Sequence, residues 1–116
     1  NEHFAVVLHN CGNTGGQNQS MLSTGAWGLH FGNKNDMGKT LAELPRDVLL
    51  MGNVDPAGAF RMGTPADVLA TTTQLLEATA AYPNFILSSG CDIPPLVPAA
   101  NVDAFQLALD RFNAGR

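Results

Sequence analysis

Short apolar runs alternate with longer amphipathic segments along the chain. The runs are made mainly of aliphatic and aromatic side chains and occupy residues 4–8, 27–31, 48–51 and 85–87. Continuous apolar runs of this length predict strands that are buried on both faces, as in a parallel sheet. The second run is less regular than the others, because Gly28 and His30 interrupt it at alternate positions.

The clearest helix signal begins at Thr64. This residue has the character of an N-cap, Pro65 follows at the first helical position, and Asp67 stands three residues after the cap. Such a start predicts a capping box and a helix over residues 64–81. Four side chains then share one face of that helix: Val68, Leu75, Leu76 and Thr79.

Three further helices are predicted. Residues 36–44 form a short candidate that ends at Pro45. A terminal helix is indicated by apolar positions at i, i+3, i+7 and i+10, with Gly115 beyond them as a stop signal. These positions are Val102, Phe105, Leu109 and Phe112. Residues 14–23 give a weaker pattern, because two consecutive glycines fall in the first turn.

The element order is therefore βαβαβαβα, which predicts the α/β class with a parallel sheet and crossover connections. Four units in 116 residues give about 29 residues each, close to the roughly 31 of an eight-unit barrel of about 250 residues. We expect half of a (β/α)8 TIM barrel, with an open four-stranded sheet as the alternative. A half-barrel leaves two strand edges to be covered, so we expect a homo-oligomer or pairing with another half.

Composition narrows the function classes. The length allows one small domain, and the 14% of charged residues is low against the roughly 25% that is usual, so we expect much of the surface to be covered. A net charge of −4 with six Lys+Arg argues against nucleic acid and anionic membranes as partners. The longest apolar runs are far shorter than a membrane span, and two cysteines are too few for a disulfide scaffold. We expect a cytoplasmic protein. Because the chain starts at Asn1 with an apolar run only three residues later, we also expect a fragment of a longer chain.

Candidate chemistry gathers in the segments that follow the predicted strands, where parallel α/β folds place their sites. Both cysteines and one of the three histidines fall in these segments. The four segments have the sequences HNCGNT (9–14), GNKND (32–36), GNVDP (52–56) and SSGCDIPP (88–95).

His9, Cys11 and Cys91 form a candidate metal site. His9 and Cys11 are two apart on an extended strand end, so both side chains can point the same way. Cys91 stands at the matching end of the fourth strand. One imidazole and two thiolates are a donor set that zinc prefers, and three protein ligands with an open position are typical of catalytic zinc. On spacing alone the plainer interpretation is favoured, namely a pair of core cysteines with a hydrogen-bonded histidine.

Other polar residues at these ends keep two interpretations each. Asn53 and Asp55 are candidates for shaping the mouth of a catalytic site, or form a purely structural turn. We interpret His30 as a polar strand end rather than a ligand. Asp92 is a candidate for orienting His9 or a substrate amine, or for capping a turn. The glycine-rich segment 12–16 matches neither nucleotide-binding fingerprint, so we interpret it as a loop that lets the backbone turn near the site.

The same segments resemble a known family. The motifs LHNCGNT (8–14), GNVDP (52–56), GTP (63–65) and ILSSGCDIPP (86–95) are similar, in order and spacing, to the C-terminal half of the uroporphyrinogen decarboxylase superfamily. The closer likeness is to its methylcobamide:coenzyme M methyltransferase branch. The resemblance implies a (β/α)8 barrel, of which residues 1–116 are a single C-terminal half-barrel domain.

In that branch an H-x-C motif and a later cysteine bind zinc, which implies zinc at His9, Cys11 and Cys91. The resemblance further implies methyl transfer from methylcobalamin, held on a partner corrinoid protein, to a small thiol or similar acceptor. One departure concerns the pattern TGAWGLHFG (24–32), in which Trp27 and Gly32 stand where relatives often carry acids. That departure leaves the identity of the acceptor open.

Two alternatives remain beside the methyltransferase. A tetrapyrrole decarboxylase like uroporphyrinogen decarboxylase would hold no metal and would bind an acidic porphyrinogen, for which the chain offers few cations. A non-catalytic folding or assembly fragment is the other. We expect the isolated chain to be inactive, because the resemblance places part of the mouth in an N-terminal half.

Overall fold

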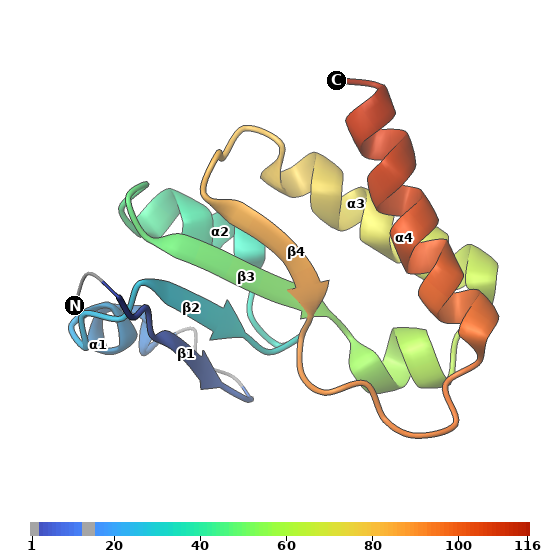
Figure 1. The fold of residues 1–116 in the computed structure, drawn as a ribbon, viewed down its shortest axis with the longest axis horizontal. Coiled ribbons are helices and arrows are strands. Elements are labelled where there is room, and N and C mark those ends of the chain that lie inside the picture. Colours follow the sequence, from blue (N-terminus) through green and yellow to red (C-terminus); the bar gives the residue numbers. More distant parts are fainter. Residues whose placement is uncertain (1–2, 13–15) are drawn as a thin grey trace.

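The computed structural model describes residues 3–12 and 16–116, which form one four-stranded sheet with helices packed against it (Figure 1). Its elements are β1 (Val7–Asn10), α1 (Asn18–Leu22), β2 (Gly28–Phe31), α2 (Met37–Glu43), β3 (Leu49–Val54), the π-helical turn η1 (Pro56–Arg61), α3 (Pro65–Thr79), β4 (Phe85–Ser89) and α4 (Ala99–Ala114).

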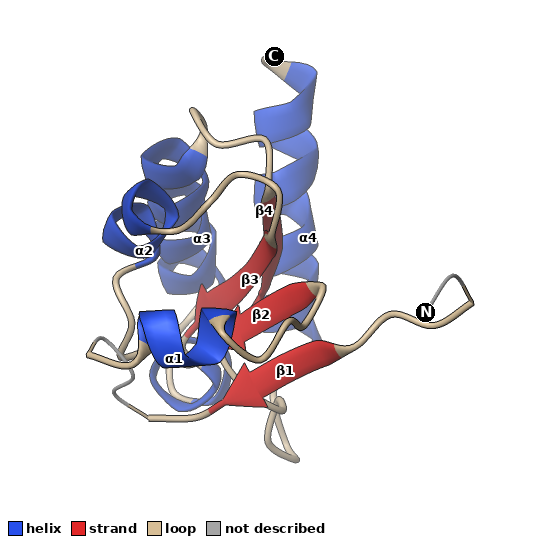
Figure 2. Cartoon of the chain, turned by 90° about the vertical axis from the view of Figure 1, so that its left-hand side faces the viewer, coloured by secondary structure: helices blue, strands red, loops and turns tan. Residues whose placement is uncertain are grey.

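All neighbouring strands are parallel, and their order in the sheet is their order in the chain. Figure 2 shows them stepping from β1 to β4. Four consecutive parallel strands, each followed by a helical segment, are the arrangement of half of a (β/α)8 barrel. The predicted α/β fold with four βα units is confirmed.

The core lies on one face of the sheet. Around Leu29, Phe31 and Leu50 it includes side chains of α1 and α2, and around Val54 it includes side chains of η1, α3 and α4. Because side chains alternate along a strand, the other face carries the intervening residues. Three of these are large apolar side chains between 39% and 50% exposed: Val7, Leu49 and Ile86. Within the described part of the chain, this open face has no covering layer.

The first strand departs from its predicted burial. β1 begins at Val7 rather than at Phe4, and both Phe4 and Val6 are exposed. The prediction of strands buried on both faces is wrong for β1, which is an edge strand beside the open face. It is also wrong for β3 and β4, whose Leu49 and Ile86 are exposed on that face. β2 is more buried than its sequence suggests. It lies between two strands and is almost fully buried, although Gly28 and His30 interrupt its apolar run.

The starts of α2 and α3 agree with the sequence. Thr64 and Asp67 form the predicted capping box, and Asp36 caps α2, which ends before Pro45. The predicted helix over residues 14–23 is reduced to α1, and the first two of its residues, 14 and 15, lie outside the described residues. The turn η1 was not predicted, although Asp55 before Pro56 is an N-cap signal of the same kind as Thr64 before Pro65.

The buried face of α4 is shifted from the predicted one. Its buried residues are Asn101, Ala104 and Ala108, whereas Val102 is exposed. Asn101 is buried where an apolar residue was expected. Its Nδ2 donates hydrogen bonds to the carbonyls of Phe60 and Gly63 at 2.8 and 2.9 Å. A buried amide therefore fastens α4 to the end of η1.

No helix among the residues that the structure describes is long and apolar enough to cross a membrane.

Candidate metal centre

The three predicted ligands come from the two edges of the sheet. His9 is in β1, Cys11 follows β1 directly, and Cys91 lies two residues after the end of β4. Two strands separate β1 from β4 in the sheet order. The side chains can meet only if the segments beyond these strands bend over the end of the sheet.

Glycines permit that bend. The Gly90 amide donates to the Val54 carbonyl at 2.8 Å, and a Cβ on Gly90 would lie 2.7 Å from the backbone nitrogen of Asn33. A Cβ on Gly32 would likewise lie 3.2 Å from the nitrogen of Gly12. The backbone after β4 therefore touches the loop after β2, which in turn touches the loop after β1. This chain of close backbone contacts brings Cys91 toward Cys11.

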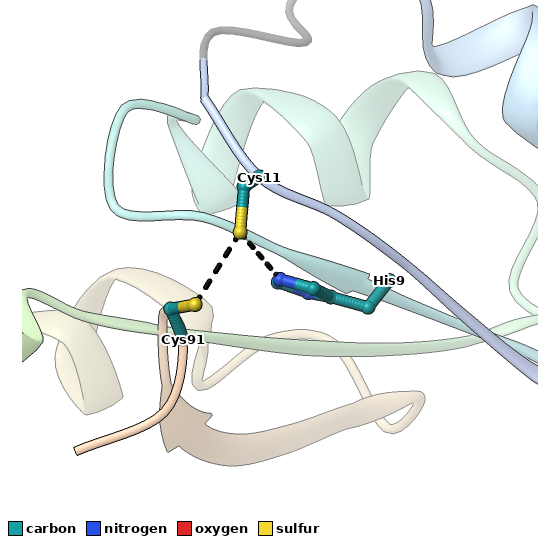
Figure 3. Close-up of side chains that lie close together, drawn as sticks. All are labelled: His9, Cys11 and Cys91. Carbon is teal, nitrogen blue, oxygen red and sulfur yellow. Dashed lines mark hydrogen bonds between the residues drawn. The ribbon is translucent and has the colours of Figure 1, made fainter. Parts of the chain in front are cut away.

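The ligand atoms of His9, Cys11 and Cys91 lie within 4.8 Å of one another (Figure 3). Cys11 Sγ is the middle atom, 2.8 Å from His9 Nε2 and 3.3 Å from Cys91 Sγ. His9 and Cys11 are exposed and Cys91 is half-buried, and both thiols are free. The structure thus brings the three predicted ligands together at a surface that a substrate can reach.

The electrostatic surroundings keep the metal-free Cys11 protonated. The hydrogen bond with Cys91 raises the pKa of the Cys11 thiol, and desolvation and electrostatic interaction with Cys91 and Asp92 raise it further. These effects reverse when a cation is present, because a coordinated thiol loses its proton. The arrangement therefore favours a neutral thiol without a cation and a thiolate with one.

The donor set fits zinc in chemistry and nearly in size. Zinc binds sulfur at about 2.3 Å and nitrogen at about 2.0–2.1 Å, so tetrahedral coordination separates two sulfurs by roughly 3.8 Å and sulfur from nitrogen by roughly 3.5 Å. The corresponding distances of 3.3 and 2.8 Å are shorter by about half an ångström or slightly more. Small rotations of exposed side chains supply that change. Three ligands would leave one of four positions open.

His30 lies beside this trio of donors. Its ring and the His9 ring have centroids 4.6 Å apart, and its Nε2 lies 2.7 Å from the Ser89 carbonyl oxygen. Sequence reasoning treated His30 only as a polar strand end. A signal was present, because His9 and His30 each lie two residues beyond the start of their strands and are paired in register.

Asn53 and Asp55 lie outside the trio. Asn53 Nδ2 donates to the carbonyls of Gly32 and Asn35, which fastens β3 to the loop after β2. The Asp55 carboxylate accepts the amides of Ala57 and Gly58 at 3.0 and 2.9 Å and caps η1. Both residues line a cavity of about 350 Å³ together with four other polar side chains and two apolar ones. The polar four are Asn33, Asn35, Thr71 and Gln74, and the apolar pair is Val54 and Leu75. The structure shows bonding that holds loops together, and a role of the two residues in shaping a catalytic mouth stays a prediction.

Comparison with known proteins gives consistent results. The family model of uroporphyrinogen decarboxylase (URO-D) matches residues 1–112. The methylcobamide:CoM methyltransferases MtbA of Methanosarcina acetivorans and Methanosarcina mazei are 33% and 35% identical over 97 and 98 residues, each covering 84% of this chain. A uroporphyrinogen decarboxylase of Ectopseudomonas mendocina is 31% identical over 96 residues, or 83% of the chain.

A solved structure gives the same likeness. A methyltransferase from Methanosarcina mazei superposes with a TM-score of 0.83 and 29% identity over 94% of this chain, which is 32% of that protein. The chain spans about a quarter of the length of the curated relatives it matches, 27% for both MtbA proteins.

Proposed function

Because the chain belongs to the uroporphyrinogen decarboxylase family, we propose that it forms the zinc- and thiol-binding half of a corrinoid-linked methyltransferase. One observation carries the proposal, namely that His9, Cys11 and Cys91 place their ligand atoms within 4.8 Å of one another. The two MtbA relatives, whose name specifies methylcobamide and CoM, support the methyltransferase branch. In this proposal the methyl donor is methylcobalamin on a partner corrinoid protein and the acceptor is a small thiol.

The chain's own residues would hold the metal ion and balance its charge. His9, Cys11 and Cys91 would hold zinc, and two thiolates with a neutral imidazole balance the charge of a divalent ion. Cys11 and Cys91 would each release a proton as the site fills. Zinc, when bound, lowers the pKa of a thiol in the open position so that it is a thiolate at neutral pH. The overall reaction forms a sulfur–carbon bond and breaks a cobalt–carbon bond, whose electron pair stays on the corrinoid.

Placement in the whole protein is part of the proposal. Residues 1–116 would be a single C-terminal half-barrel of a longer chain, and the open face of the sheet would be covered by an N-terminal half or by a second copy. Reduced thiols suit the cytoplasm, where glutathione and thioredoxin keep cysteines reduced. The isolated chain is expected to bind zinc without turnover.

The first test is the zinc content of the purified, zinc-reconstituted chain by elemental analysis. We expect about one zinc per chain, and loss of that zinc in Cys91→Ser, because a tetrahedral site requires its thiolates. His3→Ala is the matched control, since it removes a histidine outside the trio and should keep the zinc. Absence of zinc from the reconstituted wild-type chain would sink the proposal.

A decarboxylase relative is the second candidate, favoured by the 31% identity to the Ectopseudomonas mendocina protein. It requires no metal and a site for an acidic tetrapyrrole. The chain has a net charge of −4 and six Lys+Arg, so it offers little positive charge for such a substrate. A metal-free chain that binds a porphyrinogen would favour this candidate. A chain that binds neither, and gains no activity when mixed with an N-terminal half, would be a folding or assembly fragment.

A further inference from the structure

We propose that His30 is a positioning residue that links the end of β4 to β1 and so holds Cys91 against Cys11. The inference deepens the proposed function, since the cysteines it positions are the proposed zinc ligands. It concerns contacts of this chain alone, and it can be tested without metal.

The first link joins His30 to His9. The two residues are register partners in adjacent parallel strands, so their side chains leave the sheet on the same face. Their ring centroids are 4.6 Å apart and their planes are inclined by 38°. The His30 ring therefore limits the orientations that the exposed His9 ring can adopt.

The second link joins His30 to β4. A carbonyl oxygen only accepts hydrogen bonds, so His30 Nε2, 2.7 Å from the Ser89 oxygen, must carry the proton and donate it. β3 lies between β2 and β4, and the His30 side chain thus connects two strands that are not neighbours. Ser89 continues the connection, because its Oγ donates to the Cys91 carbonyl at 2.7 Å.

The connection runs from His9 through His30 and Ser89 to Cys91. It matters because His9 and Cys11 are exposed, so that close packing does little to fix them. His30 itself is half-buried, and its Nε2 is already bonded to Ser89. It acts on the trio from outside the donor set. Residues that orient metal ligands typically change metal affinity about 10- to 100-fold when removed.

Two substitutions separate the ring of His30 from its hydrogen bond. His30→Phe keeps a ring beside His9 and removes the donor, whereas His30→Gln keeps a side-chain N–H of similar reach and removes the ring. The metal-free chain is equilibrated with reduced and oxidised glutathione, and the fraction with a Cys11–Cys91 disulfide gives the effective concentration of one thiol at the other. We expect His30→Phe to lower this concentration, because the bond to Ser89 is lost. His30→Gln keeps that bond and loses only the ring contact with His9, so we expect it to lower the concentration less.

Cobalt(II) supplies a second readout. The thiolate-to-cobalt absorption band should weaken and shift in His30→Phe and recover in part in His30→Gln, which keeps the hydrogen-bond donor but not the ring beside His9. Asn101→Ala is the control for general destabilisation, because it removes buried hydrogen bonds at η1 and leaves the trio untouched. If His30→Phe does not fold, His30→Asn replaces it, since the shorter amide does not reach Ser89.

The outcomes separate this inference from the proposed function. A smaller fraction of the Cys11–Cys91 disulfide in His30→Phe, with an unchanged fraction in Asn101→Ala, supports the positioning role. This holds whether or not the wild-type chain binds zinc. Thiol pairing and a cobalt spectrum that are the same in wild type and His30→Phe would overturn it, even in a chain that binds zinc.

Discussion

At the scale of single residues, glycines decide whether the donor atoms meet. Gly32 and Gly90 stand where three loop backbones touch, and neither position leaves room for a β-carbon without displacement. The ligands themselves are exposed and weakly packed. Their geometry therefore depends on how closely the backbones behind them can approach.

Gly90→Ala is expected to disturb the trio. The new Cβ would lie 2.7 Å from the Asn33 nitrogen, and overpacking of this kind typically costs about 1–3 kcal/mol. Because the clash is with backbone, the β4 loop must move away from the β2 loop and carry Cys91 with it. Zinc affinity measured with a competing chelator should fall by about tenfold or more.

Gly16→Ala is the matched control, since an added Cβ at Gly16 meets nothing within 4 Å. Equal zinc affinity in the two alanine variants would show that the close approach at Gly90 is irrelevant to the site.

At the scale of elements, the helix starts show most clearly what a local sequence determines. The Thr64–Asp67 capping box is reciprocal: Asp67 N donates to Thr64 Oγ1 at 3.2 Å, and Thr64 N donates to the Asp67 carboxylate at 2.9 Å. The backbone hydrogen bond from Thr64, and then the bond with its side chain, lower the pKa of the Asp67 carboxyl.

We expect Thr64→Ala to reduce the free energy of unfolding by about 1 kcal/mol, the usual cost of losing an N-cap.

Asp67→Asn is expected to change how the free energy of unfolding depends on pH. Because the folded-state pKa of Asp67 is lowered, its stabilisation is present above the unfolded-state pKa and is lost as the pH falls through the folded value. Urea unfolding at neutral pH should therefore separate Asp67→Asn from wild type, and the gap should narrow in acid. A constant gap at all pH values would contradict this assignment.

Features set by neighbouring residues could be predicted from the sequence. Features set by contacts between distant segments could not. The cap at Thr64, the short helix that begins near Asp36 and the H-x-C pair on one strand end are set by neighbours in the chain. Three other features depend on which distant segment lies opposite. These are the exposure of β1, the burial of Asn101 on α4 and the hydrogen bond from His30 to Ser89. Cys91 was grouped with His9 and Cys11 because it follows the fourth predicted strand, and the family resemblance then implied zinc at the three residues.

At the scale of the whole molecule, the open face of the sheet governs association. Val7, Leu49 and Ile86 expose apolar surface on the side away from the helices. Parallel sheets of α/β folds are covered on both faces. Residues 3–12 and 16–116 present one covered face of the sheet and one open face.

We expect the chain to self-associate at micromolar concentration, because pairing of open faces removes apolar surface from water. Sedimentation should give concentration-dependent species heavier than the 12.2 kDa chain. Ile86→Lys should shift the equilibrium toward the monomer. Val102→Lys is the matched control, since Val102 is similarly exposed, 41% against 43%, but lies on α4. A wild-type chain that stays monomeric would contradict this expectation.

The meeting of Cys11 and Cys91 has a consequence for the free energy of folding. These residues are 80 positions apart in a chain of 116, so a connection between them closes more than two thirds of the chain into a ring. For a covalent link, loop-closure entropy in the unfolded state predicts a gain of about 4–5 kcal/mol for a ring of this size. A shared metal ion acts in the same direction, and its binding free energy becomes part of the free energy of folding. The proposed metal site therefore also stabilises the fold, because it links the ends of β1 and β4. A chelator should remove the metal and lower the unfolding temperature.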